Sequence, residues 1–137
     1  MNSELAGNLN EILTCLLPEL EEKLKLREDT ITASRKVTVL SKQAVMAVHQ
    51  RNLEEASSKL KEAEQILRNI EDRISSHPDV RRESANIAYQ EYAEARIFEA
   101  VVSGLRFPSP QDLRIPTIQY VLGLADSIGE FRRRAVA

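Results

Sequence analysis

Apolar residues recur every three or four positions along almost the whole chain, which is the repeat of an amphipathic α-helix. The clearest example is the segment 53–74, whose apolar positions are Leu53, Ala56, Leu60, Ala63, Leu67, Ile70 and Ile74. β-branched residues nowhere gather into alternating runs, so we expect no sheet. The pattern predicts an all-α protein.

Prolines, glycines and short polar stretches divide this pattern into five predicted helices. They cover residues 3–16, 18–50, 53–74, 82–104 and 116–137. A break before Pro18 is expected because proline is tolerated in a first helical turn, where its missing N–H has no internal partner. "GLRFPSPQDLRIP", residues 104–116, holds three prolines and a glycine and predicts a loop. The mostly short connections predict an antiparallel helical bundle in a single domain, residues 1–137.

Composition narrows the class of protein. The 137 residues are 42% hydrophobic and 29% charged, which suits one domain with a real core. There is no run of 18 apolar residues and no signal sequence, so we expect a cytoplasmic protein without a membrane contact. The single cysteine, Cys15, excludes an intramolecular disulfide and is expected to be a small buried residue. The net charge of −2 means that contact with nucleic acid requires a local basic patch.

Two glutamates in the helix 82–104 have no basic residue three or four positions away. On a helical wheel Glu91 falls inside the arc of an apolar face, and Glu94 falls at its edge. That face is expected to consist of Ile87, Ala95, Phe98 and Val102. A carboxylate on an apolar face is costly unless it is paired. The partner is either a lysine or arginine from another helix or a metal ion.

The last helix carries a second acidic pair, Asp126 and Glu130. Asp126 has no cation at helical spacing, whereas Glu130 can reach Arg133 or Arg134. The pair lies beside an expected apolar stripe of Val121, Ala125, Ile128 and Ala135, so a solvated charged flank is an open alternative. Gly123 and Gly129 indicate a close approach of another element, because glycine inside a helix is otherwise costly. Packing on the preceding helix would unite Glu91, Glu94, Asp126 and Glu130, here called the acid cluster, and such hard oxygen donors suit Mg²⁺ or Mn²⁺.

Basic residues supply candidate phosphate contacts. Arg35, Lys42 and His49 recur every seven residues and share one helix face, with Arg51 nearby. The loop adds Arg106 and Arg114 beside Phe107, as an RNA contact, a lid or a subunit contact. A merely solvated face is the alternative reading of the helical set. Since His49 and His77 are the only histidines and His77 lies in a proline-bounded turn, a two-histidine cleavage mechanism is disfavoured.

Three segments resemble the translin family, specifically the translin-associated factor X branch and its archaeal relatives. They are "YQEYAEA" at residues 89–95, "YVLGLADSIGEFRRRA" at residues 120–135 and "SRKVTVLSKQAVMAVHQRNLEEA" at residues 34–56. The resemblance implies a translin-like all-α bundle and an endoribonuclease that requires Mg²⁺ or Mn²⁺. It places the catalytic, metal-binding acids at Glu91, Glu94, Asp126 and Glu130, with Glu130 as a ligand or as the base that orients water.

The resemblance also implies partners. These are single-stranded RNA, or single-stranded DNA, and further copies of the chain in a closed shell, a hexamer or an octamer. The alternative is a catalytically inactive RNA- or DNA-binding or scaffold subunit of a translin-type complex, and a purely structural helical module is a third class. The chain stops at Ala137 in mid-helix, whereas family members continue through one or two more helices, so it is expected to be short at the C-terminus.

Overall fold

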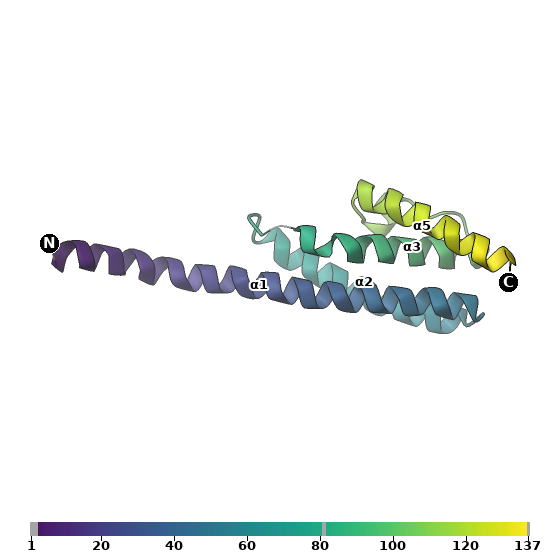
Figure 1. The fold of residues 1–137 in the computed structure, drawn as a ribbon, viewed down its shortest axis with the longest axis horizontal. Coiled ribbons are helices and arrows are strands. Elements are labelled where there is room, and N and C mark those ends of the chain that lie inside the picture. The colour runs from purple at the N-terminus through teal and green to yellow at the C-terminus, as the bar shows by residue number, and fades with distance from the viewer. Residues whose placement is uncertain (1–2, 81, 137) are drawn as a thin grey trace.

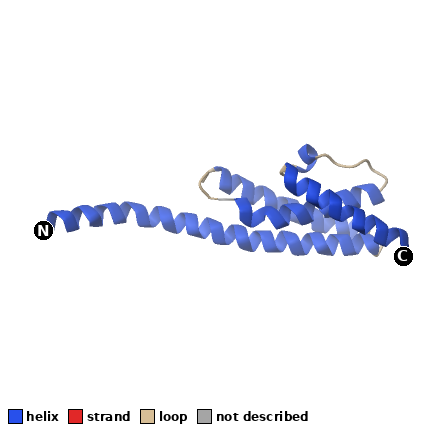
Figure 2. Ribbon diagram, turned by 45° about the horizontal axis from the view of Figure 1, so that its top comes forward, coloured by secondary structure: helices blue, strands red, loops and turns tan. Residues whose placement is uncertain are grey.

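The structure, a computed structural model, describes residues 3–80 and 82–136, and these residues form helices with no strand (Figure 2). The elements are α1 (Ser3–His49), α2 (Leu53–Ser75), the 3₁₀ turn η1 (Arg82–Ala85), α3 (Asn86–Val102), α4 (Pro110–Leu113) and α5 (Thr117–Val136). The all-α prediction is confirmed. Within the described chain, no helix combines the length and the apolar character that a bilayer crossing requires.

The long helix α1 forms an antiparallel hairpin with α2, and α3 packs on both (Figure 1). The hairpin turns at the predicted connector. Arg51 adopts a left-handed conformation with φ of 62°, and the Asn52 side chain accepts a hydrogen bond from the backbone N–H of Glu55 at 3.1 Å, which caps α2. Helix α5 then lies along the face of α3, so the bundle has α3 at its centre.

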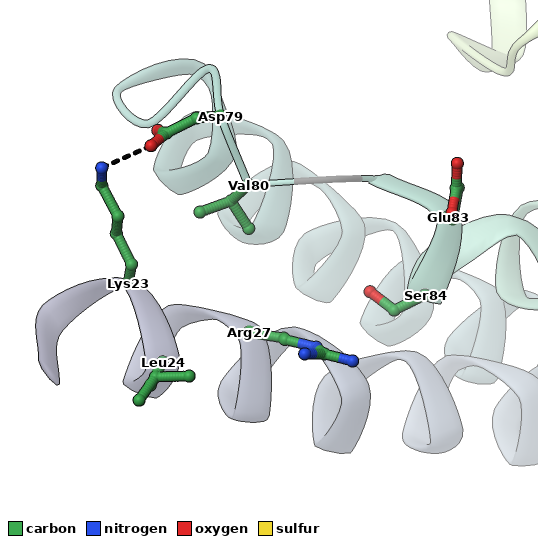
Figure 3. A pocket seen from close by; sticks show the side chains of 7 residues that line it. All are labelled: Lys23, Leu24, Arg27, Asp79, Val80, Glu83 and Ser84. Atoms are coloured by element: carbon green, nitrogen blue, oxygen red, sulfur yellow. Dashed lines mark hydrogen bonds and ion pairs between the residues drawn. The ribbon is translucent and has the colours of Figure 1, made fainter. Parts of the chain in front are cut away.

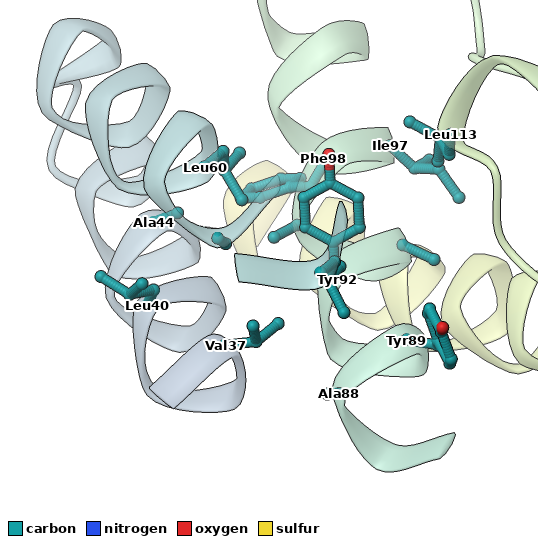
Figure 4. Packing of buried hydrophobic residues seen from close by; sticks show 14 of the residues in the cluster. Val37, Leu40, Ala44, Leu60, Ala88, Tyr89, Tyr92, Ile97, Phe98 and Leu113 are labelled. Carbon is teal, nitrogen blue, oxygen red and sulfur yellow. The ribbon is translucent and has the colours of Figure 1, made fainter. Parts of the chain in front are cut away.

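Aliphatic residues of α1 and α2 and aromatic residues of α3 form the core (Figure 4). Tyr89, Tyr92 and Phe98 are its largest fully buried side chains, and aromatic rings of this size each bury a large apolar area. The predicted stripe of α2 is confirmed except at its first member, because Leu53 is exposed. The expected face of α3 is wrong at Ile87, which is 68% exposed.

The predicted break at Pro18 does not occur. Helix α1 continues through Pro18, in a segment where residues 3–22 are all exposed. A proline inside a helix removes one hydrogen bond and bends the helix, but the leucines and glutamates around Pro18 are strong helix formers that keep the chain helical. Cys15 lies in the same segment and is exposed, so the expectation of a buried cysteine is wrong as well.

The first contact between α1 and the rest of the bundle lies near Lys23, whose ammonium group pairs with the carboxylate of Asp79 (Figure 3). The two residues border a hollow of about 480 Å³ that contains none of the predicted site residues. From Leu26 onward α1 carries buried side chains. The helix therefore has a packed half and a projecting half.

The segment predicted as a loop, residues 104–116, contains the four-residue helix α4. Ser109 and Asp112 form a reciprocal capping box, which explains how so short a helix is held despite the neighbouring prolines. Two bonds fix the segment to the bundle. The Tyr120 hydroxyl donates to the carbonyl of Pro108 at 2.5 Å, and the Arg68 guanidinium donates to the carbonyl of Leu113 at 2.9 Å.

The expected apolar stripe of α5 is also wrong. Val121, Ala125, Ile128 and Ala135 are all exposed. The face that packs on α3 is built from Gly123 and Ser127, which are buried, and from partly buried Tyr120, Leu124 and Phe131. The acidic pair of α5 therefore lies nearer to the interface with α3 than the sequence pattern indicated.

Candidate functional site

Gly123 lets α5 approach the middle of α3. A Cβ atom at this position would lie 2.7 Å from the carbonyl oxygen of Gln90 and 2.8 Å from the Cβ of Ala93, so no larger residue fits without displacement. The predicted close approach is confirmed at Gly123. It is wrong for Gly129, where an added Cβ would meet nothing within 4 Å. The contact at Gly123 places the next turns of α5, which carry the acidic pair, beside the glutamates of α3.

Three of the four residues of the acid cluster line a hollow of about 700 Å³ between α1, α3 and α5. Its lining residues are Lys42, Val45, Met46, His49, Gln50, Glu91, Glu94, Glu130 and Arg133. Asp126 does not line the hollow; its carboxylate accepts a hydrogen bond from the Gln90 side chain at 2.8 Å. One wall is therefore acidic, and the α1 wall carries a lysine and a histidine.

Burial and mutual repulsion act on the two glutamates of α3. The pKa of Glu94 is raised to about 7, first by burial and then by the negative charges of the other three acids. Burial also raises the pKa of Glu91, and the nearby charge of Lys42 opposes that rise. Negative charge is thus concentrated at this site beyond what its surroundings neutralise.

Glu130 is the acid with the most direct partners. Its Oε2 atom lies 2.5 Å from Nε2 of His49 and 3.6 Å from Nη1 of Arg133. The His49 ring in turn rests against Phe98, with 4.8 Å between the ring centroids. Because Phe98 is fully buried, it holds the imidazole, and through it the Glu130 carboxylate, in one orientation.

No lysine, arginine or histidine of residues 3–80 and 83–136 forms an ion pair with Glu91, Glu94 or Asp126. A lysine or arginine from another helix, one of the two partners predicted for the α3 glutamates, is therefore not paired with any of these three acids. As the side chains stand, no three aspartate, glutamate, histidine or cysteine residues of the described segments converge where they could hold a metal ion.

The predicted RNA-binding residues are only partly brought together. Lys42 and His49 line the hollow beside the acid cluster. Arg35 and Arg51 are exposed at other places on the α1–α2 hairpin. Arg106 borders a separate hollow of about 320 Å³ with Arg96 and Glu99. Exposed Arg114 ends α4 in a left-handed conformation with φ of 53°.

Sequence reasoning missed two contributors to the site: Gln90 holds Asp126, and Phe98 supports His49. The predicted pairing of Glu130 with Arg133 is confirmed, and Arg133 also lines the hollow. The sequence pattern predicts His49 as an RNA contact and not as a partner of Glu130. The only signal for Gln90 is its place in the "YQEYAEA" segment.

Solved structures that match the fold include three structures of C3PO proteins. The crystal structure of apo-NeC3PO matches with a TM-score of 0.83 at 22% identity, over 90% of this chain and 66% of that chain. The structure of an AfC3PO–duplex RNA complex matches with a TM-score of 0.80 at 29% identity, and the crystal structure of AfC3PO with 0.80 at 30%. Both AfC3PO matches cover 90% of this chain and 64% of those chains.

The chain thus spans about two thirds of the length of the C3PO chains that it matches. No family model matches it, and neither does any curated protein. The helices and their order are shared with the C3PO structures over nine tenths of the chain. The fold of this protein is translin-like, the fold of the C3PO proteins.

Proposed function

We propose that this chain is a metal-dependent endoribonuclease of the translin-associated factor X branch, which cleaves single-stranded RNA within a homo-oligomer. The observation that carries the proposal is the acid cluster. Three of its four carboxylates line one hollow, and Glu91, Glu94 and Asp126 have no ion pair in the described chain. A purely structural cluster would be expected to hold cations between its acids.

The donor set fits Mg²⁺ or Mn²⁺ in kind, because both ions prefer carboxylate oxygen. The raised pKa of Glu94 supports this, because burial and then repulsion by the other acids disfavour its charged form, and a divalent cation would offset both effects. Glu91, Glu94 and Asp126 would be ligands, with Glu130 as a ligand or as the base that orients water. When bound, such an ion supplies an activated water and stabilises the charge that develops on the phosphate.

The chain's own residues would bind and orient the RNA. Lys42 and Arg133 line the same hollow as the acids, so either can contact a phosphate that enters it. Glu130 Oε2, aligned by His49 Nε2, would accept the hydrogen bond that fixes an attacking water. Met46 and Val45 give the hollow an apolar side.

The similarity to an AfC3PO chain that forms a complex with duplex RNA supports an RNA partner. The proposal of single-stranded RNA as the cleaved form rests on the resemblance of the motifs, and duplex RNA is therefore the natural comparison substrate. An inactive RNA-binding or scaffold subunit is the second candidate. It is favoured by the pairing of Glu130 with His49 and of Asp126 with Gln90, which engages two of the four acids.

The test of the proposed function is cleavage of an unstructured RNA by the purified protein. We expect cleavage with Mg²⁺ or Mn²⁺ and none after chelation, because cleavage without a metal would need a second histidine beside His49. The other histidine, His77, pairs with Glu22, which lies in α1 far from His49. A duplex of the same sequence measures strand preference. Undiminished cleavage in chelator would refute the metal mechanism, and RNA binding without cleavage under any condition would establish the second candidate.

A basic face on α1 gives a separate prediction for RNA binding. Replacing Arg35 and Lys42 together by alanine should weaken binding and reduce the slope of log K against log salt by about one unit for each phosphate that is no longer bound. Lys36→Ala is the matched control, because Lys36 is already paired with Glu62 at 3.1 Å. Equal slopes for the double variant and the wild type would show that Arg35 and Lys42 do not contact phosphates and that this face is only solvated.

A further inference from the structure

One member of the acid cluster, Asp126, lies outside the hollow that the other three line. Asp126 is exposed, and its Oδ2 atom accepts a hydrogen bond from Nε2 of Gln90 at 2.8 Å. Burial, and beyond it the negative charge of Asp126, raises the pKa of Glu91 and of Glu94, so Asp126 is within electrostatic reach of both. Asp126 therefore lies at the edge of the site, bonded to a side chain that is not an acid.

The packing of α5 on α3 explains why Asp126 reaches Gln90. Further along both helices Phe131 contacts Phe98, with 5.5 Å between the ring centroids, so α3 and α5 run in the same direction. Side chains of a helix lean toward its N-terminus, which carries the Asp126 carboxylate back toward Gln90. Glu94 lies on the same side of α3, one turn after Gln90. A change of the χ1 rotamer of Asp126 therefore turns its carboxylate from Gln90 toward Glu94.

The Gln90 side chain is a neutral partner for this carboxylate. A lysine or arginine in its place would form an ion pair and cancel a negative charge that attracts a divalent cation. A glutamate in its place would add a fifth acid to the site. One hydrogen bond from an amide has a small net free energy, because water replaces it readily at an exposed carboxylate. Gln90 thus holds Asp126 without neutralising it, through a bond that an ion can displace.

We propose that Gln90 is a positioning residue, which holds Asp126 outside the hollow while the site is free of metal and gives up the carboxylate to Mg²⁺ or Mn²⁺. The inference rests on the proposed function, in which Asp126 is a metal ligand. The hydrogen bond keeps a fourth carboxylate turned away from three that already repel one another. It also competes with the ion for Asp126, so Gln90 lowers the affinity of the site for metal.

The full chain with Gln90→Met should bind Mn²⁺ more tightly than the wild type in the absence of RNA. Methionine keeps the length of the side chain and is a good helix former, but it has no N–H to donate to Asp126. We expect an affinity roughly three- to tenfold higher, which is the factor that one net hydrogen bond contributes. The electron paramagnetic resonance signal of free Mn²⁺ gives the dissociation constants. Removal of a side chain with a merely structural role would not tighten binding.

Two further experiments show whether the effect acts through Asp126. Asp126→Ala should weaken Mn²⁺ binding, and the addition of Gln90→Met to this variant should then change nothing, because the competition is for Asp126 alone. Gln65→Met is the matched control. It removes another side-chain amide hydrogen bond, from Gln65 to Asn69 at 3.2 Å on α2, and should bind Mn²⁺ like the wild type.

The side-chain amide of Gln90 reports the exchange directly. Its signal in a ¹H–¹⁵N NMR spectrum is assigned by its absence from the spectrum of Gln90→Met. Saturating Mg²⁺ should shift this signal in the wild type to the place where it lies in metal-free Asp126→Ala, since the amide has lost its acceptor in both.

The outcomes separate this inference from the proposed function. Equal or weaker Mn²⁺ binding by Gln90→Met, the same gain in the Asp126→Ala background or in Gln65→Met, or an amide signal that Mg²⁺ does not shift would overturn the role of Gln90 and leave the proposed metal site standing. A wild type that binds no Mn²⁺ would overturn the proposed function as well.

Discussion

Gly123→Val is expected to leave little folded protein. Even the Cβ of alanine would lie 2.7 Å from the Gln90 carbonyl oxygen, 2.8 Å from the Ala93 Cβ and 3.0 Å from the Glu94 backbone nitrogen. Two of these atoms belong to the α3 backbone, which cannot rotate aside, so α5 must move away from α3. Overpacking costs about 1–3 kcal/mol where side chains can adjust, and we expect the upper end or more here.

Gly123→Ala and Gly129→Ala make a matched pair on the same helix. Alanine gains up to about 1 kcal/mol over glycine in a helix interior, and at position 129 no contact opposes that gain. Chemical unfolding followed by circular dichroism should therefore show opposite signs, with Gly129→Ala stabilised and Gly123→Ala destabilised. Equal stabilities of the two variants would mean that α5 does not depend on the contact at Gly123.

Glu94→Gln is expected to abolish cleavage while it stabilises the metal-free protein. Loss of a proposed metal ligand should lower the cleavage rate about a hundredfold or more, since even residues that only support ligands cost roughly 10–100-fold. The free energy of unfolding should increase, because the glutamine keeps the volume of the side chain and removes a charge that burial and three neighbouring acids disfavour. A glutamate that served as a structural ion-pair partner would give the reverse, a less stable variant.

The stability that Glu94→Gln gains over the wild type should increase as the pH rises. Since folding raises the pKa of Glu94 from 4.5 to about 7, wild-type protein in chelator is most stable below pH 4.5 as far as this group is concerned, and it loses that stability as the pH rises through 7. The loss is on the order of 3 kcal/mol at pH 8. Thermal unfolding at several pH values should show the loss in the wild type and its absence in Glu94→Gln.

Glu99→Gln is the control for this pair of effects. Glu99 lies on the same helix, and burial raises its pKa as well, but it borders the separate hollow with Arg106. Its replacement should also stabilise the fold and should leave cleavage unchanged. Loss of cleavage in both variants would show that any loss of charge on α3 is enough, which would remove the support for a specific role of Glu94.

Local signals explain which parts of the fold could be predicted. The connector at Arg51, the end of α2 before His77 and the stop after Val102 all follow from residues that act on their own backbone. Gly104, for example, adopts φ of 81°, which only glycine adopts freely, and it ends α3 where the sequence indicated.

Faces of helices are harder to predict because a neighbour decides which face is covered. In α5, Val121 and Ile128 form as good an apolar row as Tyr120 and Phe131 do. The structure buries the second row because Gly123, between them, fits against α3. The break predicted at Pro18 is wrong for a similar reason. The sequence does not reveal that α1 continues through Pro18 in a segment that no other helix covers.

The acid cluster could be predicted because basic residues are missing at helical spacing. Its partners could not be predicted in that way, because they come from distant parts of the chain. His49 and Glu130 are 81 residues apart, and Gln90 and Asp126 are 36 residues apart. Only the packing of α1, α3 and α5 brings such groups within hydrogen-bonding distance.

The site is divided between two helix pairs, and this division affects the order in which it forms during synthesis on the ribosome. α1 and α2 are neighbours in sequence and pack as a hairpin, and α3 and α5 form a second pair joined by a short segment. Such local pairs close quickly. Lys42 and His49 belong to the first pair, and all four acids belong to the second. A nascent chain can therefore complete the α1–α2 hairpin, with Lys42 and His49, before any of the carboxylates is synthesised, and the mutual repulsion of those carboxylates arises only when α5 packs on α3.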